Sequence, residues 1–196
     1  PILPFMAPEF GASHLDIAFL ITVYSVLAGI CAPYWGKLSD RIGRKPVILI
    51  CLVGASVSYL LLAFATTLWM LYVARAFGGL MAGNFGVASA MVADISKPQD
   101  RSKYMGIIGS AFGLGMVIGP FMGGMLSGND GNFFLPCVVA AGMSLTACLA
   151  GSIFLRESLD TDKRDSHAQY RADQGHLSSW AVLKKSGNRL LVSQYF

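Results

Sequence analysis

The short basic stretch GKLSDRIGRKP, residues 36–46, separates two long apolar runs and decides how the chain folds. The runs on either side, 17–35 and 46–64, contain no charged residue. A helix needs about 20 mostly apolar residues to cross the roughly 30 Å hydrocarbon core of a bilayer, and both runs are about that long. The stretch therefore predicts a tight turn between two antiparallel transmembrane helices, with Trp35 ending the first helix and Pro46 beginning the second.

Three further runs of membrane-spanning length follow, at 68–93, 104–126 and 133–155, and Arg75 is the one charged residue within them. Hydrophobic residues make up 54% of the chain and charged residues 13%. A soluble domain has about 25% charged residues, so this chain would not remain dissolved in water. The composition predicts an all-α membrane protein and excludes a soluble globular domain.

Apolar residues at the two ends of the sequence extend this pattern. We expect residues 1–10 to be the outer end of a truncated first helix, which makes 1–155 a six-helix amino-terminal bundle. Residues 156–188 are polar and are expected to form a cytoplasmic linker, because their low hydrophobicity keeps them out of the membrane. The apolar run 189–196 is expected to begin a seventh helix.

The basic residues fall in alternate connectors, and this sets the predicted orientation of the helices. All of the 15 Lys and Arg residues except Arg75 lie in 36–45, 94–103 or 156–189. Because cytoplasmic connectors carry the excess of Lys and Arg, these three are expected on the inner side of the cell membrane. The net charge of +4 thus indicates attraction to anionic lipid of the bilayer, and it argues against nucleic-acid binding.

Motifs for metal binding or catalysis are absent from the sequence. The four cysteines all lie within predicted spans and lack the spacing of a zinc site; they are Cys31, Cys51, Cys137 and Cys148. Strings typical of serine hydrolases, zinc peptidases and phosphate-binding loops do not occur. We therefore predict no metal, no cofactor and no enzymatic activity.

Glycines and charges within 36–46 occupy positions that a tight turn can use. Gly43 permits a positive φ, and Gly36 permits two helix ends to approach closely. The carboxylate of Asp40 can accept hydrogen bonds from a helix amino terminus or pair with Arg44. An ordinary basic loop is the alternative interpretation, since any order of Lys and Arg would satisfy the orientation rule.

The order of residues in 36–46 resembles the loop signature of the major facilitator superfamily, and two further strings support the resemblance. Residues 71–79, LYVARAFGG, look like the second signature of the family. The string GxxxGPxxGG at 115–124 resembles the signature of its antiporters, and its members are Gly115, Gly119, Pro120, Gly123 and Gly124. The resemblance implies that this bundle pairs with a missing carboxy-terminal six-helix bundle to enclose a site at the membrane midplane.

The resemblance also implies roles for individual residues. Asp40 and Arg44 would form a charge cluster with Asp94, at the end of the fourth helix, and this cluster would act as a conformational latch. Neighbouring members of the same signature are Gly36, Arg41 and Gly43. Arg75 would anchor a cavity or take part in proton-linked charge switching, because a guanidinium inside a membrane is unfavourable without a polar partner. Snorkelling of Arg75 to the outer interface is the alternative.

The glycines of the predicted fifth helix carry a structural expectation of their own. Gly115, Gly119 and Gly123 recur at four-residue intervals and so lie on one helix face. Small residues at this spacing permit close contact between helices, and a hinge or a tight interface is therefore expected here. Packing of an ordinary helix pair is the alternative.

Four apolar or aromatic side chains are candidate lining residues of a cavity for hydrophobic drugs, with packing or lipid contact as an equal alternative: Tyr24, Phe85, Phe112 and Met116. Residues 55–72 and 106–120 especially resemble the tetracycline efflux branch. That branch has an acid on its third helix where this chain has Ser58. This difference argues against tetracycline itself as the substrate.

The resemblance implies a secondary transporter that exports small hydrophobic molecules in exchange for protons by alternating access. A proton symporter or facilitator for a sugar or other metabolite is the alternative on the same fold, and a membrane scaffold or receptor that moves no solute is a third possibility. No Asp or Glu lies within the five predicted spans. The residue that would carry the proton is therefore not identified by this sequence.

Overall fold

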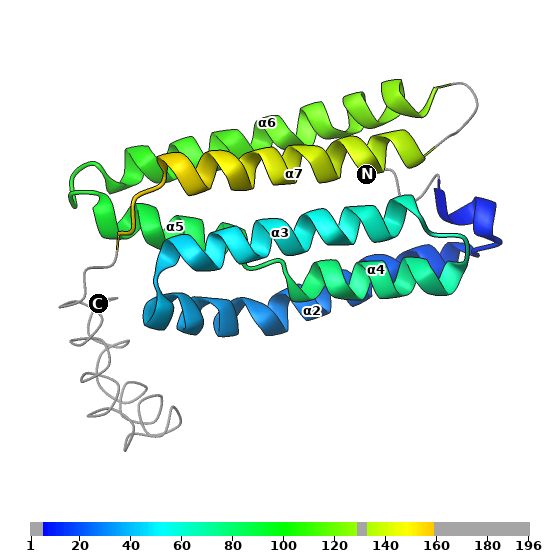
Figure 1. Cartoon of the computed structure of the whole chain (residues 1–196), viewed down its shortest axis with the longest axis horizontal. Helices are drawn as coiled ribbons and strands as arrows, with labels where there is room; N and C mark the ends of the chain where they lie inside the picture. The colour runs from blue at the N-terminus through cyan, green and yellow to red at the C-terminus, as the bar shows by residue number, and fades with distance from the viewer. Residues whose placement is uncertain (1–5, 129–132, 159–196) are drawn as a thin grey trace, which may run out of the picture. The chain divides into compact units, whose positions relative to one another are not determined.

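The described part of the chain forms helices and contains no strand (Figure 1). The computed structural model describes residues 6–128 and 133–158. Its elements are the 3-10 helix η1 (Ala7–Phe10) and the α-helices α2 (His14–Ile42), α3 (Arg44–Ala63), α4 (Leu68–Leu80), α5 (Asn84–Ile95), α6 (Arg101–Ser127) and α7 (Phe134–Phe154). The predicted all-α class is confirmed.

Five segments of the described chain are long and apolar enough to cross a membrane, and they coincide with the five predicted runs. Four of them are α2, α3, α6 and α7, and the remaining one is Leu68–Ile95, which comprises α4 and α5. Ahead of α2, the described residues of the expected first helix include only the short η1. The predicted linker beyond residue 158 and the predicted seventh helix lie outside the described residues.

Helix α3 lies between α7 and α4, so it is the central helix of the described bundle (Figure 1). Its contact with α7 is reinforced by two hydroxyl groups that donate hydrogen bonds across the helix pair. Ser56 donates to the carbonyl oxygen of Ala141 at 3.0 Å, and Ser144 donates to that of Leu52 at 2.8 Å. Small hydroxyl residues pack closely and bond across helices in membranes, where the hydrophobic effect between helices is weak.

Helices α2 and α4 approach each other closely at Gly79. A methyl group on this glycine would lie 2.6 Å from the carbonyl oxygen of Tyr24 and 3.0 Å from the Cβ of Leu27. Only a residue without a Cβ fits such a contact. Leu20 on α2 and Leu71 on α4 are fully buried in an apolar cluster that also includes Leu62 of α3 and Cys137 of α7.

The basic turn between the first two membrane-length helices, α2 and α3, is shorter than the sequence predicted. Helix α2 continues past Trp35 to Ile42, and α3 begins at Arg44, so Gly43 alone separates them. The expectation of a ten-residue turn was wrong because the polar residues after Trp35 can remain helical: Lys37 and Arg41 are exposed to water, and the hydroxyl of the buried Ser39 donates to the carbonyl oxygen of Gly36. Pro46 is the third residue of α3, where a missing N–H again removes no intrahelical bond.

The fourth span, for which the sequence predicts one apolar run, is interrupted. The α-helix ends at Leu80 and resumes at Asn84. Trp35 explains how the interruption is stabilised: its indole Nε1 donates to the carbonyl oxygen of Leu80 at 2.6 Å. Its ring also occupies the space that a side chain at Gly83 would need. A break in the helical hydrogen-bond ladder is tolerated within a membrane when a side chain satisfies the freed backbone group.

Candidate functional site

The predicted latch residues meet around the buried side chain of Arg44. Its Nη1 lies 2.8 Å from Oδ1 of Asp40, and its Nε lies 3.0 Å from Oδ2 of Asp94. Nη1 also donates to Oγ of Ser39 at 2.6 Å. One guanidinium therefore joins the end of α2, the start of α3 and the end of α5. We call Arg44, Asp40, Asp94 and Ser39 the inner cluster.

Burial determines how much these contacts matter. The side chain of Arg44 is 9% exposed, whereas those of Asp40 and Asp94 are 20% and 28% exposed. A guanidinium buried to this extent is strongly destabilising when it loses its partners, because its charge is then neither solvated nor paired. The carboxylates retain contact with water, so the cluster can open without leaving both carboxylates buried.

The backbone at Gly43 places Arg44 in the inner cluster. Gly43 has φ 111° and ψ 157°, a combination that residues with a Cβ rarely adopt. Its N–H still donates to the carbonyl oxygen of Ser39 at 3.1 Å, which completes the last turn of α2. The chain then reverses within one residue, as positive φ at this glycine was expected to allow.

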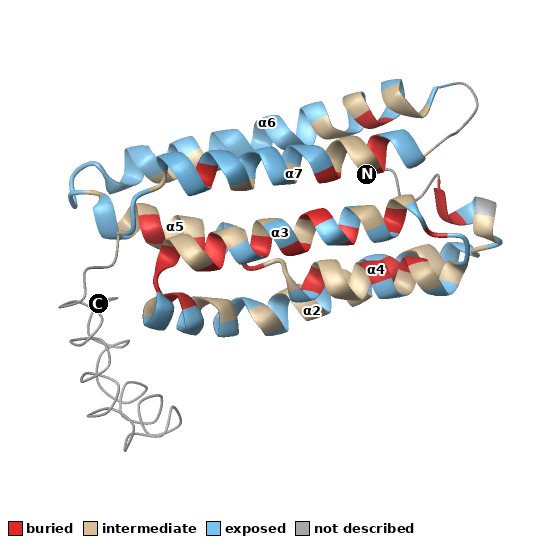
Figure 2. Ribbon diagram, in the orientation of Figure 1, coloured by how far each residue is buried: buried red, intermediate tan, exposed pale blue. Residues whose placement is uncertain are grey.

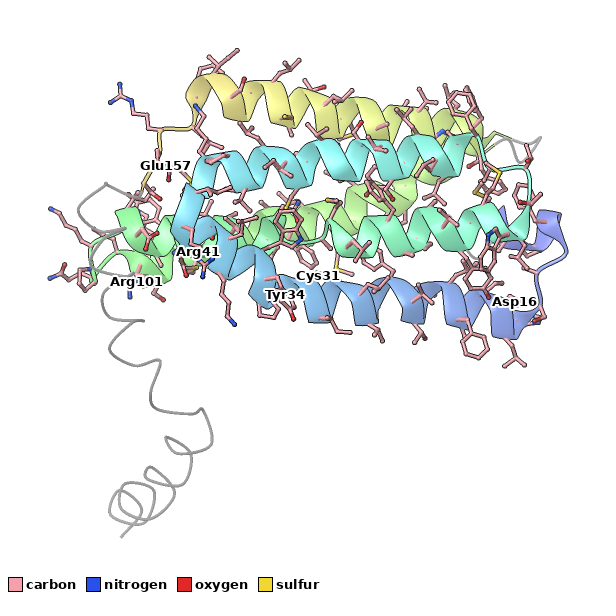
Figure 3. The ribbon with its side chains drawn as sticks, turned by 60° about the horizontal axis from the view of Figure 1, so that its bottom comes forward. Asp16, Cys31, Tyr34, Arg41, Arg101 and Glu157 are labelled. Atoms are coloured by element: carbon pink, nitrogen blue, oxygen red, sulfur yellow. The ribbon has the colours of Figure 1, made fainter. Side chains whose placement is uncertain are left out.

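Two other members of the loop signature stand apart from the inner cluster. Gly36 was expected to allow two helix ends to approach, but no atom of another element lies within 4 Å of where its Cβ would be. That expectation is wrong for the described part of the chain, because α2 remains helical through this position and presents Gly36 to open space. Arg41 is exposed at the same end of the helices (Figure 3).

The structure adds two residues that sequence reasoning missed, Ser39 and Glu157. Ser39 is fully buried, and its hydroxyl donates to the carbonyl oxygen of Gly36 at 2.8 Å while accepting from Arg44. Glu157 accepts from the backbone N–H groups at the start of α3. The position of Ser39 next to Asp40 and close to Lys37 was a weak indication of its contact with Arg44. Nothing in the spacing indicated the second, because its partners are 113 and 112 residues away.

Charged side chains gather at the two ends of the described helices. Figure 3 shows Arg41, Arg101 and Glu157 at one end and Asp16 at the opposite end. At its own end, Asp16 accepts from the N–H and hydroxyl of Ser13 at 2.9 and 2.8 Å and from the hydroxyl of Tyr72 at 3.2 Å. The labelled basic residues thus share one end of the helices, and which side of the membrane this end faces stays a prediction.

Arg75 lies on α4 against the aromatic ring of Tyr24. The guanidinium carbon is 5.8 Å from the centroid of that ring, a distance suited to a cation–π contact. Its Nε atom is buried and has no hydrogen-bond partner among the described residues. The surroundings of Arg75 thus include an aromatic face, and its Nε–H has no acceptor within the described chain.

Ser58 occupies a confined position close to Arg75. Its hydroxyl is buried and donates to the carbonyl oxygen of Ala74 at 2.9 Å. A methyl group added to Gly78 would lie 2.5 Å from this hydroxyl oxygen. The hydroxyl of Ser58 thus lies against the backbone of α4 at Ala74 and Gly78.

Most of the glycine-rich helix α6 is exposed in the described bundle (Figure 2). Of its signature residues, Gly123 is buried, Gly119 is half-buried, and the others are exposed: Gly115, Pro120 and Gly124. No other element comes within 4 Å of a Cβ placed on Gly115, Gly119 or Gly124. The expected close contact does not form at these three positions within the described chain, because α6 lies at the edge of the bundle beside α5 and α7.

The four candidate cavity residues separate into two places. Phe85 on α5 and Phe112 on α6 have ring centroids 5.5 Å apart, and both are more than half exposed. Met116, one turn beyond Phe112 on α6, is 66% exposed. Tyr24 is half-buried and contacts Arg75 instead. The structure therefore brings Phe85 and Phe112 together and shows an exposed apolar surface around them.

Metal-ligating side chains do not cluster anywhere in residues 6–128 and 133–158. The cysteines are free thiols within the bundle, with Cys51 and Cys137 buried and Cys31 and Cys148 partly buried.

Five membrane-length helices with charged residues gathered at their ends define a multi-pass membrane protein. The family model of the Major Facilitator Superfamily matches residues 1–195, and the chain belongs to this superfamily. The members of this family are transporters, which are not enzymes. The resemblance seen in the three sequence signatures is confirmed.

Relatives at about 35% identity come from the tetracycline efflux branch. The chain is 35% identical over 187 residues to the tetracycline resistance protein, class H, of Pasteurella multocida, covering 93% of this chain and 45% of that protein. It is 39% identical over 165 residues to the class B protein of Escherichia coli, covering 82% and 40%. The crystal structure of the human organic anion transporter MFSD10 (TETRAN) has a TM-score of 0.67 at 32% identity, covering 83% and 38%. This chain thus spans less than half the length of these relatives.

Proposed function

We propose that this chain is the amino-terminal part of a proton-coupled exporter of hydrophobic drugs or related small molecules, which works by alternating access. In this mechanism, two six-helix bundles rock about a central site that opens to one side of the membrane at a time. The observation that carries the proposal is the bridging of three helix ends by the buried guanidinium of Arg44.

A bridge of this kind suits a conformational latch. Arg44 holds the inner ends of α2, α3 and α5 in one arrangement as long as its two carboxylate partners remain in place. A latch must stabilise one state by only a few kcal/mol, since a larger bias would trap the transporter. Two partly exposed ion pairs on one buried cation are consistent with a bias of that size.

The exposed surface of α6 supports export of apolar substrates. Phe112 and Met116 on α6 and Phe85 on α5 present aromatic and thioether groups, which adapt to hydrophobic molecules of different shapes. The glycines of α6 leave its backbone accessible along the same helix. The tetracycline resistance proteins among the relatives favour drug-type substrates, whereas the confined position of Ser58 favours a substrate other than tetracycline.

Arg75 would act within the cavity on substrate or on coupled charge. Its buried Nε is available to an acceptor, and Tyr24 supports the guanidinium from one face. The proton carrier would lie outside the described spans, because their acidic residues, Asp16, Asp40 and Asp94, are all close to helix ends.

Proton movement in vesicles tests the proposal. Full-length protein is placed in inverted, energised vesicles, and a panel of hydrophobic drugs is added while the luminal pH is recorded. Release of protons from the lumen on drug addition, lost in Arg75→Ala and kept in the exposed control Lys103→Ala, is the expected result.

Silence across the drug panel, together with proton-coupled sugar uptake in right-side-out vesicles, would show that the protein is a symporter. Drug movement that is unaffected by the proton gradient would show a facilitator. Either result contradicts proton-coupled export.

A further inference from the structure

Helix α3 begins without a capping side chain of its own. The first N–H groups of any α-helix have no partner within the helix, and Ser, Asp or Asn at the preceding position usually satisfies one of them. Here the preceding residue is Gly43, which has no side chain to offer. Because Pro46 has no N–H, the groups that need an acceptor before the helical ladder starts are those of Arg44 and Lys45.

Glu157, which follows α7 in the sequence, supplies both acceptors. Its Oε1 accepts from the N–H of Arg44 at 2.8 Å, and its Oε2 accepts from the N–H of Lys45 at 3.2 Å. A carboxylate at this position also interacts favourably with the positive end of the helix dipole. One side chain, three residues after the end of α7, thus completes the start of α3.

A second contact joins the same two helix ends. The Nζ of Lys45 donates to the carbonyl oxygen of Ser152 in the last turn of α7 at 2.8 Å. A cation near the carboxyl end of a helix is stabilising for the same electrostatic reason. The amino end of α3 and the carboxyl end of α7 are therefore fixed to each other through charged groups in both directions.

Arg44 takes part in both sets of contacts. Its backbone N–H is bound by Glu157, while its side chain is bound by Asp40, Asp94 and Ser39. The position of its guanidinium depends on where its Cα is held, and the hydrogen bond from its N–H to Glu157 adds to the restraint from the Gly43 backbone. We propose that Glu157 is a positioning residue of the inner cluster, acting through the backbone of Arg44, and this rests on the latch role proposed above.

The test reads the openness of the inner side without any substrate. A single cysteine replaces Ile95, which is 66% exposed beside Asp94, in full-length protein otherwise free of cysteine. Its rate of alkylation by a membrane-impermeant maleimide is measured in inverted vesicles, where the inner side faces the reagent. Glu157→Gln is compared with Arg156→Gln, a matched change at the exposed neighbouring position.

Glu157→Gln should raise the alkylation rate about two- to fivefold, the range expected for a partly solvated charge at a helix terminus. Arg156→Gln should leave the rate unchanged. Because Glu157 acts through Arg44, adding Glu157→Gln to Arg44→Ala should give no further increase. If Arg44→Ala does not fold, Asp94→Asn replaces it as the second background. In either case Glu157→Asp, which keeps the negative charge, should show most of the wild-type alkylation rate.

Three results would overturn the proposal in distinguishable ways. If Asp94→Asn speeds alkylation and Glu157→Gln does not, the latch exists and Glu157 has no part in it. If the effects of Glu157→Gln and Arg44→Ala multiply, Glu157 acts independently of Arg44 and only stabilises the fold. If neither Asp94→Asn nor Glu157→Gln changes the rate, the latch itself is refuted.

Discussion

Replacing Gly43 by alanine tests whether the one-residue turn depends on its backbone conformation. The φ of 111° and ψ of 157° fall in a region that is essentially restricted to glycine, and a side chain there costs about 1–3 kcal/mol. Gly29, inside α2, has no atom within 4 Å of its missing Cβ, so Gly29→Ala is a matched control. Alanine inside a helix is about 0.5–1 kcal/mol better than glycine. The two variants should therefore differ by about 1.5–4 kcal/mol in unfolding free energy.

The assay is reversible unfolding of the full-length protein in mixed micelles, with increasing sodium dodecyl sulfate and helix content followed by circular dichroism. Gly43→Ala should unfold at a lower detergent fraction than wild type, and Gly29→Ala at the same or a higher one. The reasoning is refuted if Gly43→Ala is as stable as Gly29→Ala. In that case the turn can relax to a conformation open to any residue, and Gly43 does not hold Arg44 in place.

Three other substitutions have expected outcomes. Asp94→Asn removes one of the negative charges that pair with the buried guanidinium of Arg44. The closed arrangement of the inner cluster should lose about 1–2 kcal/mol of stabilisation, so the inner side should open roughly 5- to 30-fold more often, as measured by inner-side cysteine labelling. Gly78→Ala should destabilise the protein by about 1–3 kcal/mol in the same unfolding assay because its methyl group meets the Ser58 hydroxyl, and Ser58→Ala in the same chain should recover most of that loss. Trp35→Phe leaves the carbonyl oxygen of Leu80 without its donor and should lower the unfolding free energy by about 1–3 kcal/mol; no change would mean that water replaces the indole.

The predictable parts of the fold are those governed by length and charge. Five apolar runs and the connectors between them were sufficient to place the spans, because the thickness of the bilayer fixes how long a helix must be. The interruption between Leu80 and Asn84 escaped prediction because its cause is the indole of Trp35, 45 residues away from Leu80. A contact between residues so far apart in the sequence cannot be predicted from a short stretch of sequence.

The candidate site divides in the same way. The charge pairing of Arg44 with Asp40 follows from their four-residue spacing across the turn, and its pairing with Asp94 was expected from the resemblance to the family. Glu157 could not be found, since a carboxylate after a helix is ordinary and its partners are backbone groups that every residue possesses. The surroundings of α6 also could not be predicted, because a four-residue glycine pattern specifies that contact is permitted, without specifying the helix that makes it.

The interruption at residues 81–83 divides the fourth span into two separate helices, α4 and α5, joined by a short non-helical segment. Arg75 lies on α4, and Asp94 lies on α5. A continuous helix would transmit any tilt from one membrane surface to the other, whereas bending concentrates where the hydrogen-bond ladder is missing. A displacement of Asp94 can thus be accommodated by bending at residues 81–83, without moving the guanidinium of Arg75 away from the ring of Tyr24.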